Sequence, residues 1–345
     1  MIRESRMSGG AVVAAIVGLA IAAPAGQTRS AVGPTAAYSP ARTPWGDPDL
    51  QGIWPGTDMV GVPFERADGF GNRLFLTDEE FRSRQTAADR QEQVDVLDFD
   101  LDRPPAEIVA LGDVGGVTSP PPHWLERGEP SRQSSLIVDP PDGRMPPMTP
   151  EGTARQQMTG GTYTRQTGFA SAADLGPYDR CISRGVVGSM MPVVYNNGNQ
   201  ILQAPGYVVL RNEMIHETRV IPLDGRPHLP AVMGSYMGDS RGSWDGDTLV
   251  VRTRNLNGRT GMQGNGNLLL SSDALQLVER FTRTGPDELQ YELTIDDPRT
   301  WTRPWTVSFP LRRDPDYRIF EYGCHEGNFA MRNVLSASRA DERGR

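Results

Sequence analysis

The most informative absence in this 345-residue sequence is lysine, because all 35 of its lysine-plus-arginine cations are arginine. Schiff-base and pyridoxal phosphate enzymes need a lysine amine, and a P-loop nucleotide site needs a lysine beside the phosphates. The sequence therefore excludes these classes, and with them pyridoxal phosphate as a cofactor. Since the net charge is −8, we do not expect a nucleic-acid partner either.

Long apolar segments are also scarce. Residues 1–25 have the pattern of a secretory signal peptide: Arg3 and Arg6 precede an apolar run over residues 11–22, and small residues follow at 23–25. An uncleaved anchor is the alternative interpretation. No later segment approaches the roughly 20 apolar residues of a membrane helix, so no transmembrane segment is expected after cleavage. The sequence predicts a periplasmic or secreted bacterial protein.

Cysteine is the third scarce residue, with only Cys181 and Cys324 in the chain. An even pair in an oxidising compartment is typical of a disulfide, and we predict that these two residues are bridged. Two alternatives remain at this point. The cysteines are buried free thiols, or Cys324 and the adjacent His325 are metal ligands.

Glycine and proline, by contrast, are abundant (38 and 29 residues), which favours turns and short strands over long helices. Residues 26–44 read as a flexible leader and residues 45–158 as an N-terminal wrapping segment. Within that segment Thr77 and Glu80 have the spacing of a capping box, which predicts a helix over 77–94. A short helix from Pro150 to about Met158 is also expected.

Residues 159–338 are predicted to form an antiparallel β domain that ends in a short helix, with a disordered tail over 339–345. Alternation of apolar and polar residues predicts a strand over 207–220, further strands over 247–253, 275–281, 289–295 and 305–311, and a last strand over 318–324. Turn signals separate them at Asp224-Gly225, Asp245-Gly246 and Gly285-Pro286-Asp287. The expected fold class is mainly β, a lipocalin-like antiparallel barrel or sandwich with a few short helices.

Polar residues on the apolar face of a strand are the first candidates for a site. Asn212, His216 and Glu279 fall on such faces, and a buried carboxylate beside a histidine would exchange protons with it. We therefore predict His216 and Glu279 as catalytic residues and Asn212 as a substrate-binding residue. The alternatives are a strand bulge that turns Glu279 to solvent, and a purely structural His216–carboxylate pair.

The end of the last predicted strand gives a second group. His325 and Glu326 follow that strand, at a position where functional loops often lie, and we predict both as catalytic residues. The alternative is that this stretch caps the final helix, with Asn328 at the cap and Glu326 near the positive end of the helix.

Further candidates come from single residues. Arg241 has a planar, fixed charge suited to an anionic group, and Trp124 and Trp305 are expected to line a cavity, unless they are ordinary core aromatics. Ser240 lies in a G-x-S-x-G string, but a strand follows it where a nucleophile elbow needs a helix. The alternative is a tight loop in which Asp239 and Arg241 bond locally. His216 and His228 flank one turn, yet no recognised metal motif is present, so a metal ion is possible but not expected.

Several strings resemble an uncharacterised family of secreted bacterial proteins. They are residues 43–52 (TPWGDPDLQG), 136–143 (LIVDPPDG), 213–216 (EMIH), 221–228 (IPLDGRPH), 238–251 (beginning GDSRG) and 324–328 (CHEGN). The resemblance implies secretion and no particular activity. Separately, Gly52-Ile53-Trp54 is similar to the G-x-W motif of lipocalin-type barrels, although the long Pro-rich segment departs from that pattern.

These observations favour an enzyme that acts on a small organic molecule, apolar or aromatic and possibly acidic, by general acid–base chemistry of the lyase, isomerase or hydrolase type. The alternatives are a lipocalin-like carrier of a small ligand, without turnover, and a structural or envelope-interaction protein.

Overall fold

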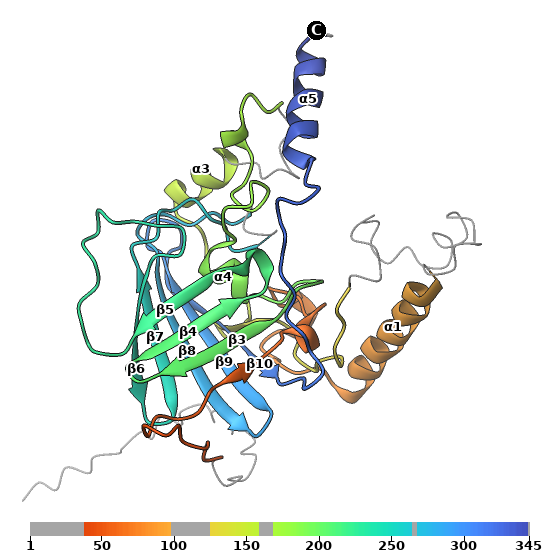
Figure 1. Ribbon diagram of the computed structural model, residues 1–345. Helices are drawn as coiled ribbons and strands as arrows, with labels where there is room; N and C mark the ends of the chain where they lie inside the picture. The colour runs from red at the N-terminus through yellow and green to blue at the C-terminus, as the bar shows by residue number, and fades with distance from the viewer. Residues whose placement is uncertain (1–37, 98–124, 159–167, 264–267, 344–345) are drawn as a thin grey trace, which may run out of the picture. The chain divides into compact units, whose positions relative to one another are not determined.

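The computed structural model describes residues 38–97, 125–158, 168–263 and 268–343, and they form two antiparallel β-sheets with a few helices (Figure 1). The predicted mainly β class is therefore confirmed. The predicted signal peptide, most of the leader, and Trp124 lie outside the described residues. Among the helices that are described, none combines the length and the apolar character needed to cross a membrane.

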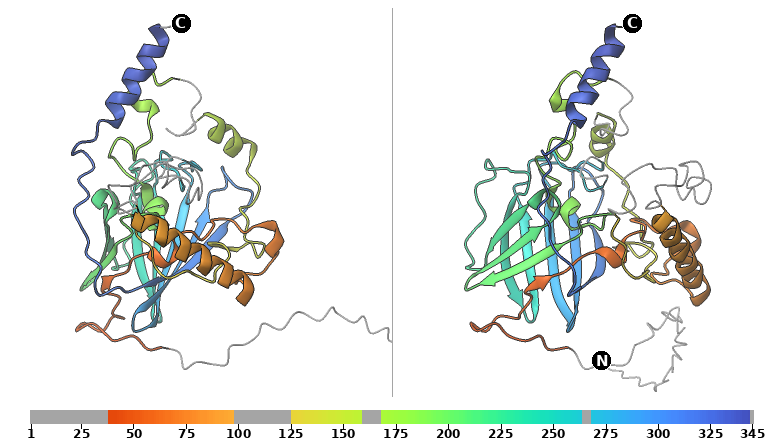
Figure 2. Two further views of the ribbon diagram at one scale, coloured as in Figure 1. Left: turned by 90° about the vertical axis from the view of Figure 1, so that its right-hand side faces the viewer. Right: turned by 45° about the vertical axis from the view of Figure 1, so that its right-hand side comes forward.

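The strands divide between a six-stranded sheet of order β2-β10-β9-β8-β7-β6 and a four-stranded sheet of order β1-β3-β4-β5. Figures 1 and 2 show the smaller sheet lying across the larger one. The strand bounds are β1 Gly52–Ile53, β2 Ile137–Asp139, β3 Asn199–Ala204, β4 Tyr207–Asn212, β5 Thr218–Pro222, β6 Asp239–Asp245, β7 Thr248–Arg254, β8 Gln276–Gly285, β9 Glu288–Asp296 and β10 Trp305–Arg312.

Two of the predicted turns form hairpins. Asp245-Gly246 joins β6 to β7, and Gly246 has the left-handed backbone (φ +60°) that such a turn requires. Gly285-Pro286-Asp287 joins β8 to β9. Asp224-Gly225 makes a tight turn instead of a hairpin, because β5 ends at Pro222 and the next strand begins only at Asp239.

The inner faces of the two sheets share one hydrophobic core. Large side chains fill it: Trp54, Phe281, Tyr291, Trp305 and Phe309 are all fully buried. The Trp54 Nε1–H donates to the Leu50 carbonyl at 2.9 Å, and the Arg283 guanidinium lies 5.5 Å from its ring centre. The space between the sheets is therefore occupied by the protein's own aromatic rings.

The N-terminal segment does more than wrap this core, because its strands β1 and β2 pair with β3 and β10. Helix α1 spans Asp78–Leu97, close to the predicted 77–94. The capping box at its start is confirmed: Glu80 N donates to Thr77 Oγ1 at 3.3 Å, and Thr77 N donates to Glu80 Oε2 at 2.7 Å.

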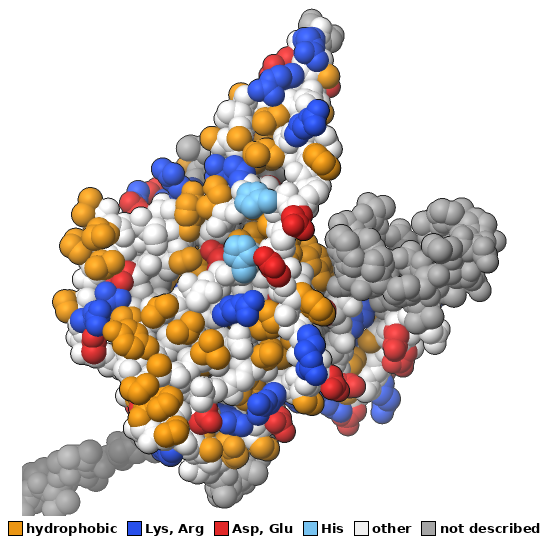
Figure 3. Space-filling view, in the orientation of Figure 1, with side chains coloured by type: hydrophobic (Ala, Val, Ile, Leu, Met, Phe, Trp, Pro, Cys, Tyr) orange, Lys and Arg blue, Asp and Glu red, His pale blue; other side chains and the backbone are white. Residues whose placement is uncertain are grey.

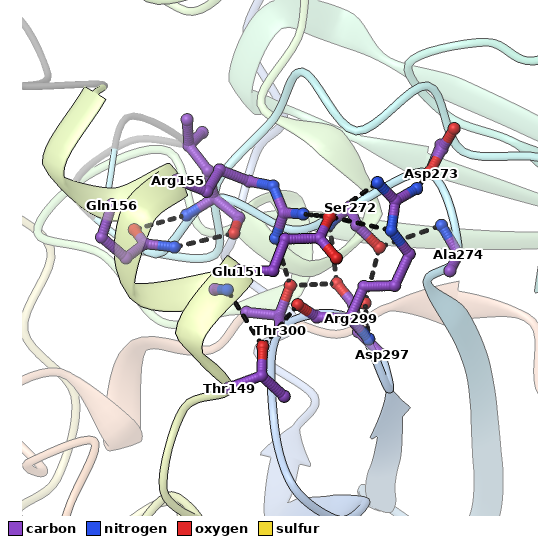
Figure 4. A network of polar contacts seen from close by, with 12 residues as sticks. Thr149, Glu151, Arg155, Gln156, Ser272, Asp273, Ala274, Asp297, Arg299 and Thr300 are labelled. Atoms are coloured by element: carbon purple, nitrogen blue, oxygen red, sulfur yellow. Dashed lines mark hydrogen bonds and ion pairs between the residues drawn. The ribbon is translucent and has the colours of Figure 1, made fainter.

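Helix α3 spans Pro150–Met158, as predicted, and a polar network fixes it against the end of the large sheet (Figure 4). Buried Asp297 accepts hydrogen bonds from Ser272 N (2.7 Å), Ser272 Oγ (2.6 Å) and Thr300 Oγ1 (2.6 Å). Arg155 of α3 donates to Thr300 Oγ1 at 2.7 Å. Both oxygens of the buried Asp297 carboxylate thus accept hydrogen bonds from neighbouring donors, and this network has a structural role.

A short helix closes one end of the core. Helix α4 spans Gly185–Met190, and all six residues are buried. Val186 and Val187 line a small cavity with Leu256 and Met262, and this cavity has room for about one water molecule. The interior at this end is therefore nearly filled.

The C-terminal strap, residues 313–329, corrects one prediction. The strand predicted over 318–324 is wrong, since these residues form no β-ladder. Instead Phe320 N donates to the buried Glu213 carboxylate at 2.9 Å, and Tyr317 Oη donates to it at 2.6 Å. Helix α5 follows at Ala330–Arg343, so most of the tail expected to be disordered is helical.

Candidate functional site

Glu279 lies inside the core, as its strand pattern predicted, but its partner is an arginine. It is fully buried on β8, opposite Val251 of β7 and Leu293 of β9. Arg219 of β5 donates to both carboxylate oxygens, at 2.6 and 2.8 Å, and Tyr291 Oη donates to Oε1 at 3.0 Å. The bulge that would have turned Glu279 to solvent does not occur.

The electrostatics agree with a closed structural pair. Burial by itself lowers the pKa of Arg219, but the Glu279 carboxylate outweighs it and the net shift is upward. Burial and the same carboxylate raise the pKa of Tyr291 well above its usual value. Arg219 therefore stays charged and Tyr291 stays protonated near neutral pH, and both of their donors are already bonded to Glu279, so this cluster is poorly suited to exchange protons.

His216 is exposed, and the expectation that it faces the interior with Glu279 is wrong. The predicted strand over 207–220 is interrupted by a 3₁₀ turn at Met214–His216, in which Ile215 and His216 adopt left-handed backbone (φ +60° and +46°). Even-numbered residues are buried in β4, whereas odd-numbered residues such as Arg219 are buried in β5. The turn therefore replaces His216 with Arg219 on the inner face.

Asn212 is buried at the end of β4. Its Nδ2 donates to Asn199 Oδ1 at 2.7 Å and to the Ser189 carbonyl at 3.3 Å, so it ties β3, β4 and α4 together. Its Oδ1 has no hydrogen-bond partner among the described residues. These contacts place Asn212 in the framework and give no indication of a substrate.

The predicted disulfide is confirmed. Cys181 and Cys324 are bridged, with their Cα atoms 5.7 Å apart, so neither is a free thiol or a metal ligand. His325 and Glu326 are exposed in the turn that follows. His216 and His325 each directly follow a residue of one small apolar cluster, Ile215 and Cys324 respectively. Figure 3 shows two exposed histidine side chains near one another on one face.

Of the predicted cavity aromatics, Trp305 is a core residue. It is fully buried and meets Phe64 and Trp301 edge to face, at centroid distances of 5.6 and 5.4 Å. Its Nε1 has no hydrogen-bond partner among the described residues. Trp124 lies outside the described residues.

Arg241 belongs to a cluster that also contains Asp239 and His228. Its Nη1 donates to Asp239 Oδ1 at 2.6 Å, and its Nε donates to the Pro227 carbonyl at 3.2 Å. The second carboxylate oxygen, Oδ2, faces His228 Nδ1 at 2.9 Å and accepts from Leu229 N at 2.9 Å. Arg241 is thus bound to an internal carboxylate, which leaves it little free charge for an anionic ligand.

The His228–Asp239 contact fixes the histidine tautomer. A carboxylate only accepts hydrogen bonds, so Nδ1 carries a proton, and in the neutral imidazole Nε2 presents its lone pair. No described residue bonds to Nε2, and the side chain is 21% exposed, whereas that of Asp239 is 7% exposed. This is the arrangement of a general base with its orienting carboxylate.

Backbone geometry brings these residues together. Gly238 has left-handed backbone (φ +65°), and a Cβ there would lie 2.5 Å from the Arg254 carbonyl oxygen, so only glycine fits where the loop enters β6. Ser240, next along β6, shares a hydrogen bond with Thr253 Oγ1 at 2.8 Å within the sheet. Ser240 is therefore a strand residue and not a nucleophile at an elbow.

The loop that joins His228 to β6, residues 229–237, exposes apolar side chains. Leu229, Val232 and Met233 are 44%, 90% and 55% exposed. Asn255 Nδ2 holds the loop by donating to the Leu229 carbonyl at 2.8 Å. Leu229 directly follows His228 in the chain, so an exposed apolar side chain is next in sequence to the histidine.

Sequence reasoning missed this pair because it weighed residues strand by strand. The available signal was in two of the quoted strings. IPLDGRPH ends with His228, and GDSRG has Asp239 as its second residue. A histidine just after a turn and an aspartate at the start of the next strand would have suggested the contact.

A second polar cluster lies beside the disulfide. Tyr178 Oη is 3.2 Å from Tyr195 Oη and 2.8 Å from Tyr322 Oη, and we call these three residues the tyrosine cluster. The Arg184 guanidinium lies 5.8 Å from the ring centre of Tyr178. This cluster was not predicted, because its members come from three separate segments.

No group of three or more histidine, cysteine, aspartate or glutamate side chains within the described ranges is arranged to hold a metal ion. In the comparisons with known proteins, no family model matches the chain, and no curated protein is similar to it in sequence.

Proposed function

We propose that the protein is a secreted or periplasmic enzyme that acts on a small organic molecule by general acid–base chemistry, with His228 as the base. The observation that carries this proposal is the Nδ1 contact of His228 with the Asp239 carboxylate at 2.9 Å, which leaves Nε2 open to a substrate. Compared with the original candidates His216 and His325, His228 has an orienting carboxylate.

The chemistry follows from the geometry. When Nε2 takes a proton, the imidazolium that forms is stabilised by Asp239, which Arg241 holds from the other oxygen. The exposed apolar side chains of residues 229–237 would contact an apolar or aromatic substrate body. Lyase, isomerase and hydrolase reactions all use such a base.

The compartment and the finer fold are part of the same proposal. The Cys181–Cys324 disulfide supports an oxidising compartment, and so does the resemblance to secreted bacterial proteins. We also infer lipocalin-like closure of the two sheets into a barrel. One support is the closeness of the edge strands β5 and β6: a Cβ at Gly242 of β6 would lie only 3.0 Å from Ile221 Cγ2 of β5. The other is Trp54 of the G-x-W string, which is fully buried in the core.

A carrier is the competing function. A lipocalin-like carrier encloses its ligand between the sheets, but here aromatic side chains fill that space. This packing favours chemistry at the loops over storage in the interior.

The test needs a readout that does not depend on the reaction type. Aromatic and terpenoid-like acids and their esters are incubated with the protein in D₂O, and NMR follows both deuterium incorporation and conversion. We expect His228→Gln to lower the rate by about 10² or more, the usual share of one positioned base, and Asp239→Asn to lower it less.

His216→Gln is the matched control, since His216 is also exposed but has no carboxylate partner among the described residues. Its rate should equal that of the unmodified protein. A rate that survives His228→Gln would remove the assignment of the base. Saturable ligand binding without any conversion would favour the carrier.

A further inference from the structure

Arg184 is a buried cation with an incomplete set of hydrogen bonds. It is 2% exposed, and its Nε has no partner among the described residues. The nearby carboxylate, Glu217, accepts from the Arg184 backbone N at 3.1 Å and from Ser189 Oγ at 3.0 Å, so these bonds do not engage the guanidinium. Glu217 thus acts on the guanidinium through its charge alone, and the buried Nε donor keeps an unfavourable, unmet hydrogen bond that a bound anion would complete.

The tyrosine cluster supplies further donors at the same place. Burial raises the pKa of Tyr178 above its usual range and that of Tyr322 to about 12, so both hydroxyls stay protonated at neutral pH. The Tyr178 hydroxyl also lies 3.6 Å from Met214 Sδ, which is a weak acceptor. These hydroxyl protons would bond more strongly to an anionic oxygen than to sulfur or to one another.

The surroundings select among anions. Tyr195 and Tyr322 are partly exposed, so the cluster lies directly beneath the surface. Ile182 and Val194, which are close in sequence to Arg184 and Tyr195, expose apolar side chains, at 40% and 41%. An inorganic anion would gain nothing from them, whereas an organic acid would bury its apolar body against them.

We propose that Arg184 and the tyrosine cluster form a binding site for a small organic carboxylate. The guanidinium fork would face the two carboxylate oxygens, and the tyrosine hydroxyls would donate to them from the side. This site is separate from the His228–Asp239 pair and does not rest on the proposed function.

The disulfide gives this site its third hydroxyl. Tyr322 is on the C-terminal strap, two residues before Cys324, and the bridge to Cys181 holds the strap beside the segment that carries Tyr178 and Arg184. The site therefore combines residues that are far apart in sequence and is complete only in the bridged chain.

Isothermal titration calorimetry of the full mature protein with benzoate tests the proposal. Benzamide is the uncharged twin of this probe, and inorganic phosphate is an anion without an apolar body. We expect saturable binding of benzoate, weaker or no binding of phosphate and none of benzamide. Tyr322→Phe should weaken benzoate binding by about tenfold or more, the share of one hydrogen bond to a charged group.

Arg184→Met should abolish binding. If that variant fails to fold, Tyr322→Phe and Tyr195→Phe decide, since each removes a single hydroxyl from a partly exposed ring. Tyr207→Phe is the matched control, because the Tyr207 hydroxyl accepts a hydrogen bond from the exposed Arg226 at the start of β4. The benzoate affinity of this variant should be unchanged. Absence of benzoate binding, phosphate binding of equal strength, or benzoate affinity insensitive to the tyrosine changes would each overturn the proposal.

Discussion

Arg219 and Glu279 face each other from different sheets and share two hydrogen bonds, of 2.6 and 2.8 Å, inside a core of aromatic side chains. Both side chains are almost fully buried, at 3% and 0% exposed. A pair of this kind contributes little net stability compared with apolar residues, but either partner left alone is a buried, uncompensated charge.

We therefore expect strong coupling between the two positions. Glu279→Gln or Arg219→Met alone should each lower the free energy of unfolding by about 3–5 kcal/mol, because each leaves the opposite charge unpaired. The double variant should lose much less than the sum of the two, since Gln still accepts from Tyr291. Urea denaturation of the four proteins measures the coupling, and additive single effects would contradict it.

The disulfide should be the largest single covalent contribution to stability. Cys181 and Cys324 are 143 residues apart, and the loop-entropy model gives a bridge of this length about 5 kcal/mol. A reductant should lower the unfolding midpoint of the unmodified protein by the corresponding amount. The Cys181→Ser/Cys324→Ser variant is the control and should not respond to reductant. If the unfolding midpoint of the unmodified protein also did not change with reductant, the predicted contribution of the disulfide would be wrong.

The start of α1 should respond to acid only at low pH. Hydrogen bonds from Arg73 and from the Thr77 backbone lower the pKa of Glu80 from 4.5 to about 2. Because the folded-state pKa is the lower one, the capping contribution is complete above pH 4.5 and is lost as the pH falls towards 2. NMR titration of the Glu80 carboxyl carbon measures the midpoint. In Arg73→Gln the midpoint should rise, and an unchanged value would show that Arg73 is not the main cause.

Strand and helix-start patterns were predictable where local chemistry decides. Strands β7 to β10 form where apolar and polar residues alternate in the sequence, and Glu279 faces inward as this alternation predicted. The capping box at Thr77 forms as the spacing of Thr77 and Glu80 predicted. The Cys181–Cys324 bridge followed from the count of cysteines and the expected compartment.

The predicted pairing of His216 with Glu279 failed because of a turn at Met214–His216 that the sequence does not signal. Ile215 is β-branched and rarely adopts left-handed backbone, and His216, although histidine adopts it more readily, is one residue within an unbroken alternation, so the local sequence does not signal the reversal of phase between β4 and β5. That reversal moves His216 outward and Arg219 inward. The C-terminal strap escaped prediction for a related reason: its alternating residues bond to a side-chain carboxylate, Glu213, and not to a neighbouring strand.

The Arg219–Glu279 pair also specifies the register of β5. Side chains along β5 alternate, so a slip of two residues would bring either Glu217 or Ile221 to the place of Arg219. The first would set two carboxylates against each other in the core, and the second would leave Glu279 without a counter-charge. Apolar residues alone would tolerate such a slip. The pair thus makes one alignment of the small sheet on the large one far more favourable than its nearest competitors.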